Sequence, residues 1–466
     1  MNNNKQKKQY TQLDILVYFV LGFFFIFTIL SLDFSKASFW IVFSFFIMGI
    51  FYFYKIISAK KNISLYRVYY IFAFVFMFYA PLQQYLSGTV FWASNGLAIT
   101  YSDDDYLKAN LVLTIFTICF EIGYHLFNSK KETKKKNYVV IPSDFAEGVM
   151  IALSLLAFAT LFISGNITNR SGYDFENQNI SGQVNNILRF IPVSCFIITF
   201  LQKDKNGKKN TFALIVYIIE IFIIFFPLNG GMSRFLLFGT YMALIALLFS
   251  HGKHKSLFFL LFIIGFFFVF SSFNYFKTHN ITDFSEFSLS LVNFNHSDFD
   301  AYQMLMASIK YVEREGVFFG GNILTVLLCW IPRSIWPGKM EPSGAIVAGY
   351  WGSWYTNLSC PIYAEFFLAF GYIGIILGAF IISWILKKID SFDYSQRYFK
   401  KGVFCVLSGF LIYILRGALL PTVSYFIATI LSLALIYVVN QYCSRIYVKK
   451  LPINIKSMNR FKSNRC

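Results

Sequence analysis

Charged side chains are scarce in this chain of 466 residues. Only 14% of the residues are charged, whereas 57% are hydrophobic and Phe alone occupies 59 positions. A water-soluble domain could not bury so much apolar surface. The composition therefore excludes an ordinary soluble protein and indicates one that lies within a lipid bilayer.

Motifs that would indicate chemistry with a bound cofactor are also missing. The sequence contains no GxxxxGK[ST] phosphate-binding loop, no nucleotide-binding fingerprint and no HExxH motif. The seven cysteines are scattered and lack the spacing of metal ligands. These absences disfavour ATP-driven chemistry and zinc proteolysis, and we expect no metal or cofactor. Cys329 and Cys360 share the predicted outer side, where a disulfide between them is an alternative to two free thiols.

Apolar runs of bilayer length recur along the whole chain. A spanning helix needs roughly 20 mainly apolar residues, because lipid cannot satisfy exposed backbone groups. We therefore predict an all-α polytopic membrane protein, and the absence of repeats and linkers predicts a single membrane domain over 1–466. The fold should contain about 12 transmembrane helices. The predicted spans are 13–32, 38–57, 66–85, 106–127, 145–164, 186–201, 211–227, 232–249, 257–275, 361–386, 402–420 and 422–441.

The basic residues predict how the chain is oriented. A net charge of +18 is compatible with nucleic-acid binding. However, roughly three quarters of the 41 Lys and Arg residues fall in segments on the side of the N-terminus, as the positive-inside rule expects of cytoplasmic loops. Both termini are therefore predicted to be cytoplasmic. No small-residue cleavage site follows the first span, which we interpret as a retained helix rather than a signal peptide.

One outer loop, 276–360, is much longer than a turn requires, and long loops in compact domains usually carry function. Its segment 298–315 predicts an amphipathic helix on the membrane surface or over the other helices. The next stretch, 318–335, is apolar but too short to span, which favours a re-entrant or interfacial segment. The apolar positions of the amphipathic helix are Tyr302, Leu305, Met306, Ile309 and Val312.

Four cationic residues lie near the predicted outer face, although most Lys and Arg residues are predicted on the cytoplasmic side. Arg234 and Arg416 lie near the outer ends of spans, and Arg333 and Lys339 flank an aromatic Pro-containing turn. Arginine offers a planar fork of donors for phosphate oxygens, and lysine offers a point charge. Together they would form a cationic pocket for a pyrophosphate. The alternative for each is snorkelling or interfacial anchoring.

Other outer residues are candidates for proton transfer or sugar binding. Glu365 begins an otherwise apolar span and is predicted either to act as a general base or to orient an arginine through a salt bridge. His296, Asp298 and Asp300 form a second candidate base or sugar-binding cluster, with a solvated loop as the alternative. Further candidate substrate-binding residues are Arg170, Trp336 and Tyr363, since aromatic faces pack on sugar rings and also suit a membrane-interface belt.

Several of these motifs occur in an order that resembles Wzy-type polymerases of O-antigen, enterobacterial common antigen and capsule repeat units. The layout of about 12 spans with a large outer loop before the last three is also similar to theirs, a polymerase/ligase architecture like that of GT-C glycosyltransferases. The resemblance covers chiefly 228–420. An Arg-to-Gly spacing described for some members is not met at Arg170. The matching motifs are Gly-Gly-x-x-Arg at 230–234, Ile-Pro-Arg-Ser-Ile-Trp-Pro-Gly-Lys at 331–339, Pro-x-x-x-Glu at 361–365, Phe-Gly-x-x-Gly at 370–374 and Leu-Arg-Gly at 415–417.

The resemblance implies a metal-independent glycosyltransferase of the bacterial cytoplasmic membrane. Its substrates would be two undecaprenyl-pyrophosphate-linked oligosaccharides on the outer face, with the arginines stabilising the departing pyrophosphate. A membrane protein that regulates chain length is a candidate partner, and no nucleic acid is expected. An O-antigen ligase and a lipid-linked oligosaccharide flippase or other transporter are the alternatives.

Overall fold

The computed structural model describes most of the chain between residues 15 and 450. The described residues are 15–16, 19, 22–23, 25–26, 29–30, 32–35, 37–59, 63–91, 99–127, 144–167, 180–202, 210–226, 233–249, 260–261, 263–266, 294–392 and 398–450. Every regular element among them is helical. Eight of these helices are long and apolar enough to cross a membrane. The chain is therefore an all-α polytopic membrane protein, as predicted.

The described helices match ten of the predicted spans. The long ones are α2 (Phe39–Ser58), α3 to α4 (Leu65–Ser87), α5 (Asp103–Leu126), α6 (Asp144–Ile163), α7 (Ile180–Leu201), α16 (Ile362–Asp390), α17 (Tyr398–Arg416) and α18 (Leu419–Lys450). Two shorter apolar helices are α8 (Thr211–Ile224) and α9 (Arg234–Phe249). The predicted spans 13–32 and 257–275 lie largely outside the described residues, so the total of 12 stays a prediction.

The span Leu65–Ser87 is the central helix of the bundle. It consists of α3 (Leu65–Phe74), a π-helical turn η1 (Val75–Tyr79) and α4 (Ala80–Ser87). The Ala80 amide bonds to the carbonyl of Val75 five residues back, and the following Pro81 has no amide hydrogen to restore the α-helical pattern. The most apolar 18 residues of this span are all buried inside the protein. Protein rather than lipid therefore surrounds this span.

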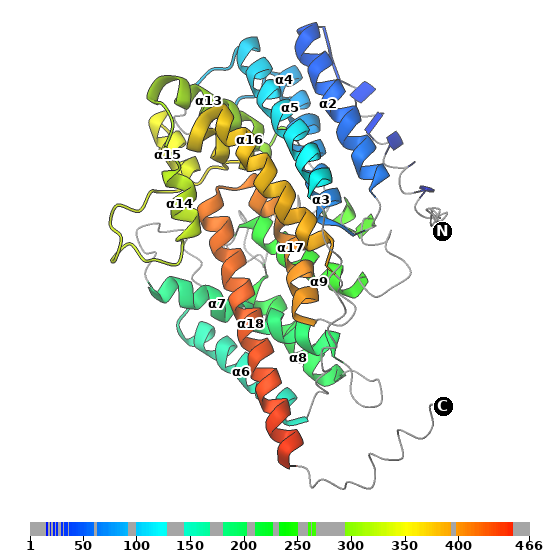
Figure 1. Ribbon diagram of the computed structural model, residues 1–466, viewed down its shortest axis with the longest axis vertical. Coiled ribbons are helices and arrows are strands. Elements are labelled where there is room, and N and C mark those ends of the chain that lie inside the picture. The colour runs from blue at the N-terminus through cyan, green and yellow to red at the C-terminus, as the bar shows by residue number, and fades with distance from the viewer. Residues whose placement is uncertain are drawn as a thin grey trace, which may run out of the picture.

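Contacts between helix termini define two ends of the bundle. At one end, Asp390 at the close of α16 accepts the Leu65 amide at 2.9 Å and thereby caps α3. At the other, Gln84 of α4 donates to the carbonyls of Phe294 and Phe299, both at 3.0 Å. We call this second end, where residues 294–361 lie, the loop end. In Figure 1, α13 (Ala301–Glu315) lies beside α16, α15 (Ser343–Tyr350) lies next to α13, and both are far from α6 and α8 along the long axis.

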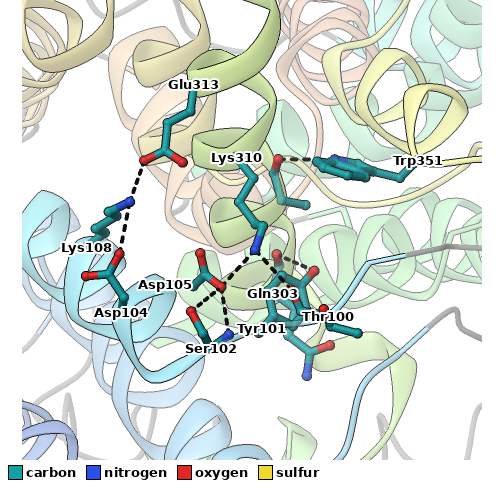
Figure 2. Close-up of polar contacts among 11 residues, drawn as sticks. Thr100, Tyr101, Ser102, Asp104, Asp105, Lys108, Gln303, Lys310, Glu313 and Trp351 are labelled. Atoms are coloured by element: carbon teal, nitrogen blue, oxygen red, sulfur yellow. Dashed lines mark hydrogen bonds and ion pairs between the residues drawn. The ribbon is translucent and has the colours of Figure 1, made fainter.

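The predicted amphipathic helix is present as α13 (Ala301–Glu315) and packs over the helices. Its apolar face is buried, with Tyr302 and Leu305 completely inaccessible. Figure 2 shows how its polar face meets α5: Lys310 Nζ lies 2.9 Å from Asp105 Oδ2, and Lys108 Nζ lies 2.8 Å from Glu313 Oε1. The loop is therefore held to the bundle by apolar burial and by two ion pairs.

The apolar stretch predicted to be re-entrant or interfacial contains the short helix α14 (Gly321–Leu327). Large apolar side chains on this segment are exposed, among them Phe319 at 83%, Leu327 at 68% and Trp330 at 60%. Exposed aromatic and aliphatic side chains suit the interfacial zone of a bilayer. The short helix α15 (Ser343–Tyr350) then returns the chain toward α16.

The predicted continuous span 361–386 is wrong in one respect, because α16 breaks after its first eight residues, at Phe370. Phe370 and Gly371 have non-helical backbone angles, with φ +60° at Gly371, which favours glycine. The carbonyls of Leu368 and Ala369 freed by the break accept amides of the loop at Phe318 and Gly320, at 2.7 and 3.1 Å. The first part of α16, 362–369, therefore belongs with the loop, and the remaining apolar part is still long enough to span.

Helices α9 and α17 approach each other very closely. A methyl group added at Gly409 of α17 would lie 2.2 Å from the carbonyl oxygen of Gly239 on α9 and 2.5 Å from the Ala243 nitrogen. Only two glycines facing each other allow backbones to pack at this distance. The contact matters because it fixes where the first residue of α9 and the last residue of α17 lie.

A methyl group at Gly409 should force α9 and α17 apart. We expect Gly409→Ala to lower the free energy of unfolding by about 1–3 kcal/mol, the usual cost of overpacking, and to reduce function further by separating Arg234 from Arg416. Thermal unfolding of the purified protein measures the first effect. Gly148→Ala is the matched control, because nothing lies within 4 Å of the added methyl group. Equal stability of the two variants would contradict the packing role of Gly409.

Candidate functional site

Two arginines from distant parts of the chain meet at the loop end. Arg234 is the first residue of α9 and Arg416 the last residue of α17. Since α9 and α17 are antiparallel and in close contact, these two ends lie side by side. A cation at a helix C-terminus is favourable, but one at an N-terminus opposes the helix dipole. Arg234 therefore needs a local negative charge.

The short helix η6 (Ser297–Phe299) and the residue after it supply that charge. Arg234 Nη2 lies 2.5 Å from Asp298 Oδ1, and Arg416 Nη2 lies 2.9 Å from Asp300 Oδ1. Arg416 also donates from Nε to the backbone carbonyl of Asp298 at 2.9 Å. The carboxylate of Asp300 is completely buried. The loop is thus tied to both helix ends by two carboxylates separated by one residue.

His296 extends this arrangement toward solvent. Its Nδ1 lies 3.3 Å both from Asp298 Oδ2 and from the Asp298 amide nitrogen. The imidazole is 36% exposed, whereas the side chains of Asp298 and Arg234 are 16% and 11% exposed. We call Arg234, His296, Asp298, Asp300 and Arg416 the loop-end cluster. It is partly buried and has one edge that a ligand can reach.

Opposing effects set the protonation state of Asp298. Burial alone would raise the pKa of its carboxyl group, but the hydrogen bond with His296 and the positive charges of Arg234 and Arg416 outweigh burial and lower the pKa below its ordinary value. Asp298 is therefore an ionised carboxylate at neutral pH. With two carboxylates and two guanidinium groups, the cluster carries little net charge.

Aromatic side chains complete the surroundings of the arginines. The guanidinium carbon of Arg416 lies 4.3 Å from the centre of the Phe235 ring, which is a cation–π contact. Tyr355 interacts electrostatically with Arg416 and Asp300, and burial together with the Asp300 carboxylate raises the pKa of its hydroxyl group. The Tyr355 hydroxyl therefore stays protonated and remains a hydrogen-bond donor beside the cluster.

Arg333 and Lys339 bind backbone carbonyls of their own turn. Arg333 donates to the carbonyls of Lys339 and Met340 at 2.6 and 3.2 Å, and Lys339 Nζ donates to those of Cys329 and Ile331 at 2.8 and 3.0 Å. Lys339 is only 2% exposed. These two side chains therefore satisfy carbonyls of an irregular turn, and a single pocket that joins them with Arg234 and Arg416 stays a prediction.

Glu365 lies in a buried polar network instead of an ion pair with an arginine. Its Oε1 accepts the Leu419 amide at 2.8 Å, and its Oε2 accepts from Asn322 at 2.9 Å and from the Ser343 hydroxyl at 2.6 Å. Leu419 is the first residue of α18, so the carboxylate caps that helix. Since α18 begins three residues after Arg416, Glu365 holds the backbone that follows this arginine and acts as a positioning residue.

The remaining predicted site residues either have contacts of their own or lie outside the described residues. Tyr363 is completely buried, and its hydroxyl bonds to that of Tyr69 at 3.2 Å. Trp336 is half-buried within the turn that Arg333 and Lys339 close. Arg170 lies outside the described residues, as do the two glycines that precede Arg234 in the predicted hairpin.

The sequence places Asp298 and Asp300 in a candidate cluster but does not indicate that they pair with Arg234 and Arg416. Tyr355 is recognisable in the sequence only as one of many loop aromatics. The signal available was the Asn-His-Ser-Asp-Phe-Asp segment at 295–300, in which two carboxylates flank one buried aromatic. Cys329 and Cys360 are both free thiols, so the alternative of a disulfide is not realised.

The lowered pKa of Asp298 predicts a loss of stability in acid. Because the folded-state pKa lies below the ordinary value of 3.8, the ionised carboxylate stabilises the fold at any pH above that value. This contribution should disappear as the pH falls through the folded-state pKa. Thermal unfolding measured across acidic pH should show the advantage of the wild type over Asp298→Asn shrinking toward zero. An advantage that does not depend on pH would contradict the charged pairing.

The loop-end cluster can bind an anion through two guanidinium groups and can accept a proton through a carboxylate next to an imidazole. Among the residues that the structure describes, no group of three His, Cys, Asp or Glu side chains could hold a metal ion. Comparison of the chain with family models, curated proteins and solved structures found no match. The site is therefore interpreted from its own residues and geometry.

Proposed function

We propose that the chain is a polysaccharide repeat-unit polymerase of the bacterial cytoplasmic membrane, with both termini in the cytoplasm and the loop end facing outward. It would transfer a growing glycan from undecaprenyl pyrophosphate to a sugar hydroxyl of another lipid-linked repeat unit. The observation that carries the proposal is the meeting of Arg234 and Arg416 at Asp298, at the end of the bundle that the long loop covers. The order of motifs over 228–420 supports the same reading.

The arginines would bind the leaving group. In the reaction, the acceptor oxygen forms a bond to the anomeric carbon while the bond from that carbon to the pyrophosphate oxygen breaks, and the lipid pyrophosphate leaves with the electron pair. Guanidinium groups match phosphate oxygens in geometry and stabilise the charge that develops on them. Arg234 and Arg416 are close enough to share one Asp residue as a partner, so both can reach one diphosphate.

Asp298 and His296 would accept the proton that the attacking sugar hydroxyl loses. In the present state Asp298 is paired with Arg234 at 2.5 Å. A pyrophosphate that binds the arginine competes with this pairing and leaves the carboxylate beside His296. Asp298 then becomes more basic, and the pair can accept the proton of the attacking hydroxyl. The donor thereby prepares the base that activates the acceptor.

Two other functions remain as alternatives. An O-antigen ligase would use the same lipid donor and the same arginines with a different acceptor. A lipid-linked oligosaccharide transporter is favoured by one observation, a buried carboxylate at Glu220 well inside the bundle, because ionisable residues within the membrane mark transport pathways. The polymerase explains the paired arginines at the loop end, which a transporter does not require.

Deletion of the gene separates these functions. The surface glycan of cells with and without the gene is compared by gel electrophoresis. The polymerase predicts that long chains disappear and that single repeat units remain on the surface. Loss of all surface glycan would contradict the polymerase and favour the transporter or the ligase.

A further inference from the structure

A second polar site lies away from the loop-end cluster, among α6, α7 and α8. Glu220, the tenth residue of α8, is only 4% exposed. Its Oε2 accepts a hydrogen bond from the Ser154 hydroxyl of α6. Its Oε1 is buried and has no hydrogen-bond partner in the part of the chain that the structure describes. A carboxyl group in such a place is costly, and the proposed polymerase reaction makes no use of it.

Two unpartnered hydroxyl groups lie near this carboxyl group. Tyr217 is one helical turn before Glu220 and interacts electrostatically with it and with Cys195 of α7. Thr199 of α7 lies beside the Tyr217 hydroxyl. Among the residues that the structure describes, the buried hydroxyl oxygens of Tyr217 and Thr199 have no hydrogen-bond partner at ordinary bonding distance and face each other. Three buried oxygen atoms, from Glu220, Tyr217 and Thr199, are therefore contributed by two helices.

The three helices offer no positive charge to balance Glu220. Across α6, α7 and α8 the sequence holds a single Lys, Arg or His residue, Arg189. Its guanidinium donates to the carbonyl of Asn166 at 3.1 Å, nearer the loop end. Among the described residues, the carboxyl group of Glu220 forms no ion pair, and the other neighbouring titratable groups, Glu147, Cys195 and Tyr217, are neutral or acidic.

Polar residues connect this site to the end of the bundle opposite the loop. Near the start of α8, Asn210 donates to Glu147 of α6 at 2.6 Å. On α7, Gln202 follows Thr199 by about one turn and has a buried oxygen without a partner. These groups place polar atoms on the side of Glu220 that faces the opposite end, which is the side from which we expect an ion to enter.

We propose that Glu220, Tyr217 and Thr199 form a binding site for one small monovalent cation, either a proton on the carboxyl group or Na⁺ held by the three oxygens. Both carry the single positive charge that neutralises Glu220, and oxygen atoms are the ligands that hard cations prefer. The site is reached from the end opposite the loop. This proposal does not rest on the polymerase function.

The test uses the purified full-length protein in detergent. Thermal unfolding is measured in NaCl and in choline chloride at equal ionic strength, and the infrared spectrum is recorded at neutral pH. If Na⁺ is the ligand, NaCl should raise the unfolding temperature of the wild type but not of Glu220→Gln. If a proton is the ligand, a carboxylic-acid C=O band should appear in the wild type and be missing from Glu220→Gln.

Two further variants keep the test decisive. Glu121→Gln is the matched control, because it removes a carboxylate of α5 that Lys55 and Tyr66 already satisfy outside the proposed site, and it should leave both signals unchanged. Tyr217→Phe removes one oxygen without altering charge and should weaken Na⁺ binding about tenfold, or shift the C=O band in the proton case. A wild type that shows neither a Na⁺-specific shift nor a band dependent on Glu220 would overturn the proposal.

Discussion

Cells that carry Arg234→Ala or Arg416→Ala should display single repeat units in place of long glycan chains. Each substitution removes a guanidinium group from the loop-end cluster and deprives one Asp carboxylate of its arginine partner. Loss of one preorganised group that stabilises developing charge typically lowers the rate by about 10²–10³-fold. Gel electrophoresis of the surface glycan, at matched protein levels and membrane insertion, measures the effect.

Lysine at either position should restore activity only in part, because it keeps the charge and loses the planar fork. Arg189→Ala is the matched control, since this arginine of α7 is also half-buried but binds the Asn166 carbonyl instead of the cluster. Its glycan should keep the wild-type chain lengths. Wild-type chain lengths in both Arg234→Ala and Arg416→Ala would remove these residues from the proposed mechanism.

The largest loss of stability is expected from Glu365→Ala. The substitution removes an acceptor from three buried donors, namely the Leu419 amide, the Ser343 hydroxyl and the Asn322 side-chain amide, of which only Asn322 keeps a second acceptor, the Glu365 carbonyl. Breaking such a buried network costs about 3–5 kcal/mol. The start of α18 and the turn after Arg416 should loosen first. We expect a lower unfolding temperature and faster proteolysis within the loop.

Glu365→Gln separates the loss of the carboxylate from the loss of volume. The amide keeps the shape but brings an NH₂ group against donors, so its stability should fall between those of the wild type and Glu365→Ala. Both variants should reduce activity in step with the loosening of the loop, as expected of a positioning residue. A fully stable Glu365→Ala protein that is inactive would instead indicate a direct chemical role.

The helices were predictable because the bilayer imposes a length and an apolar composition that the sequence states directly. The amphipathic α13 was predictable for a similar reason, since its apolar residues recur at helical spacing and all face the bundle. The break in α16 was not, because the segment around Gly371 is apolar throughout. At the break, the loop amides of Phe318 and Gly320 donate to carbonyls of α16. These contacts join segments that are distant in the sequence, so no local sequence pattern predicts them.

The candidate site likewise has some features that the sequence predicts and others that depend on contacts between distant segments. The sequence indicates Arg234 and Arg416, because a charge near the outer end of an apolar span is conspicuous. It does not indicate their partners, which depend on the close packing of α9 on α17 and on the loop crossing both. Nor does it show that Lys339 turns inward onto carbonyls of its own turn. Partnering of polar groups is a tertiary property.

The proposed function is tested most directly by reconstitution. The purified protein is placed in vesicles with pyrophosphate-linked repeat units on a polyprenyl lipid, and the products are separated by size. We expect the wild type to join repeat units and release free lipid pyrophosphate, and Arg234→Ala to leave the units unjoined. Repeat units that stay single with the wild-type protein, or that are joined equally well by Arg234→Ala, would contradict the account.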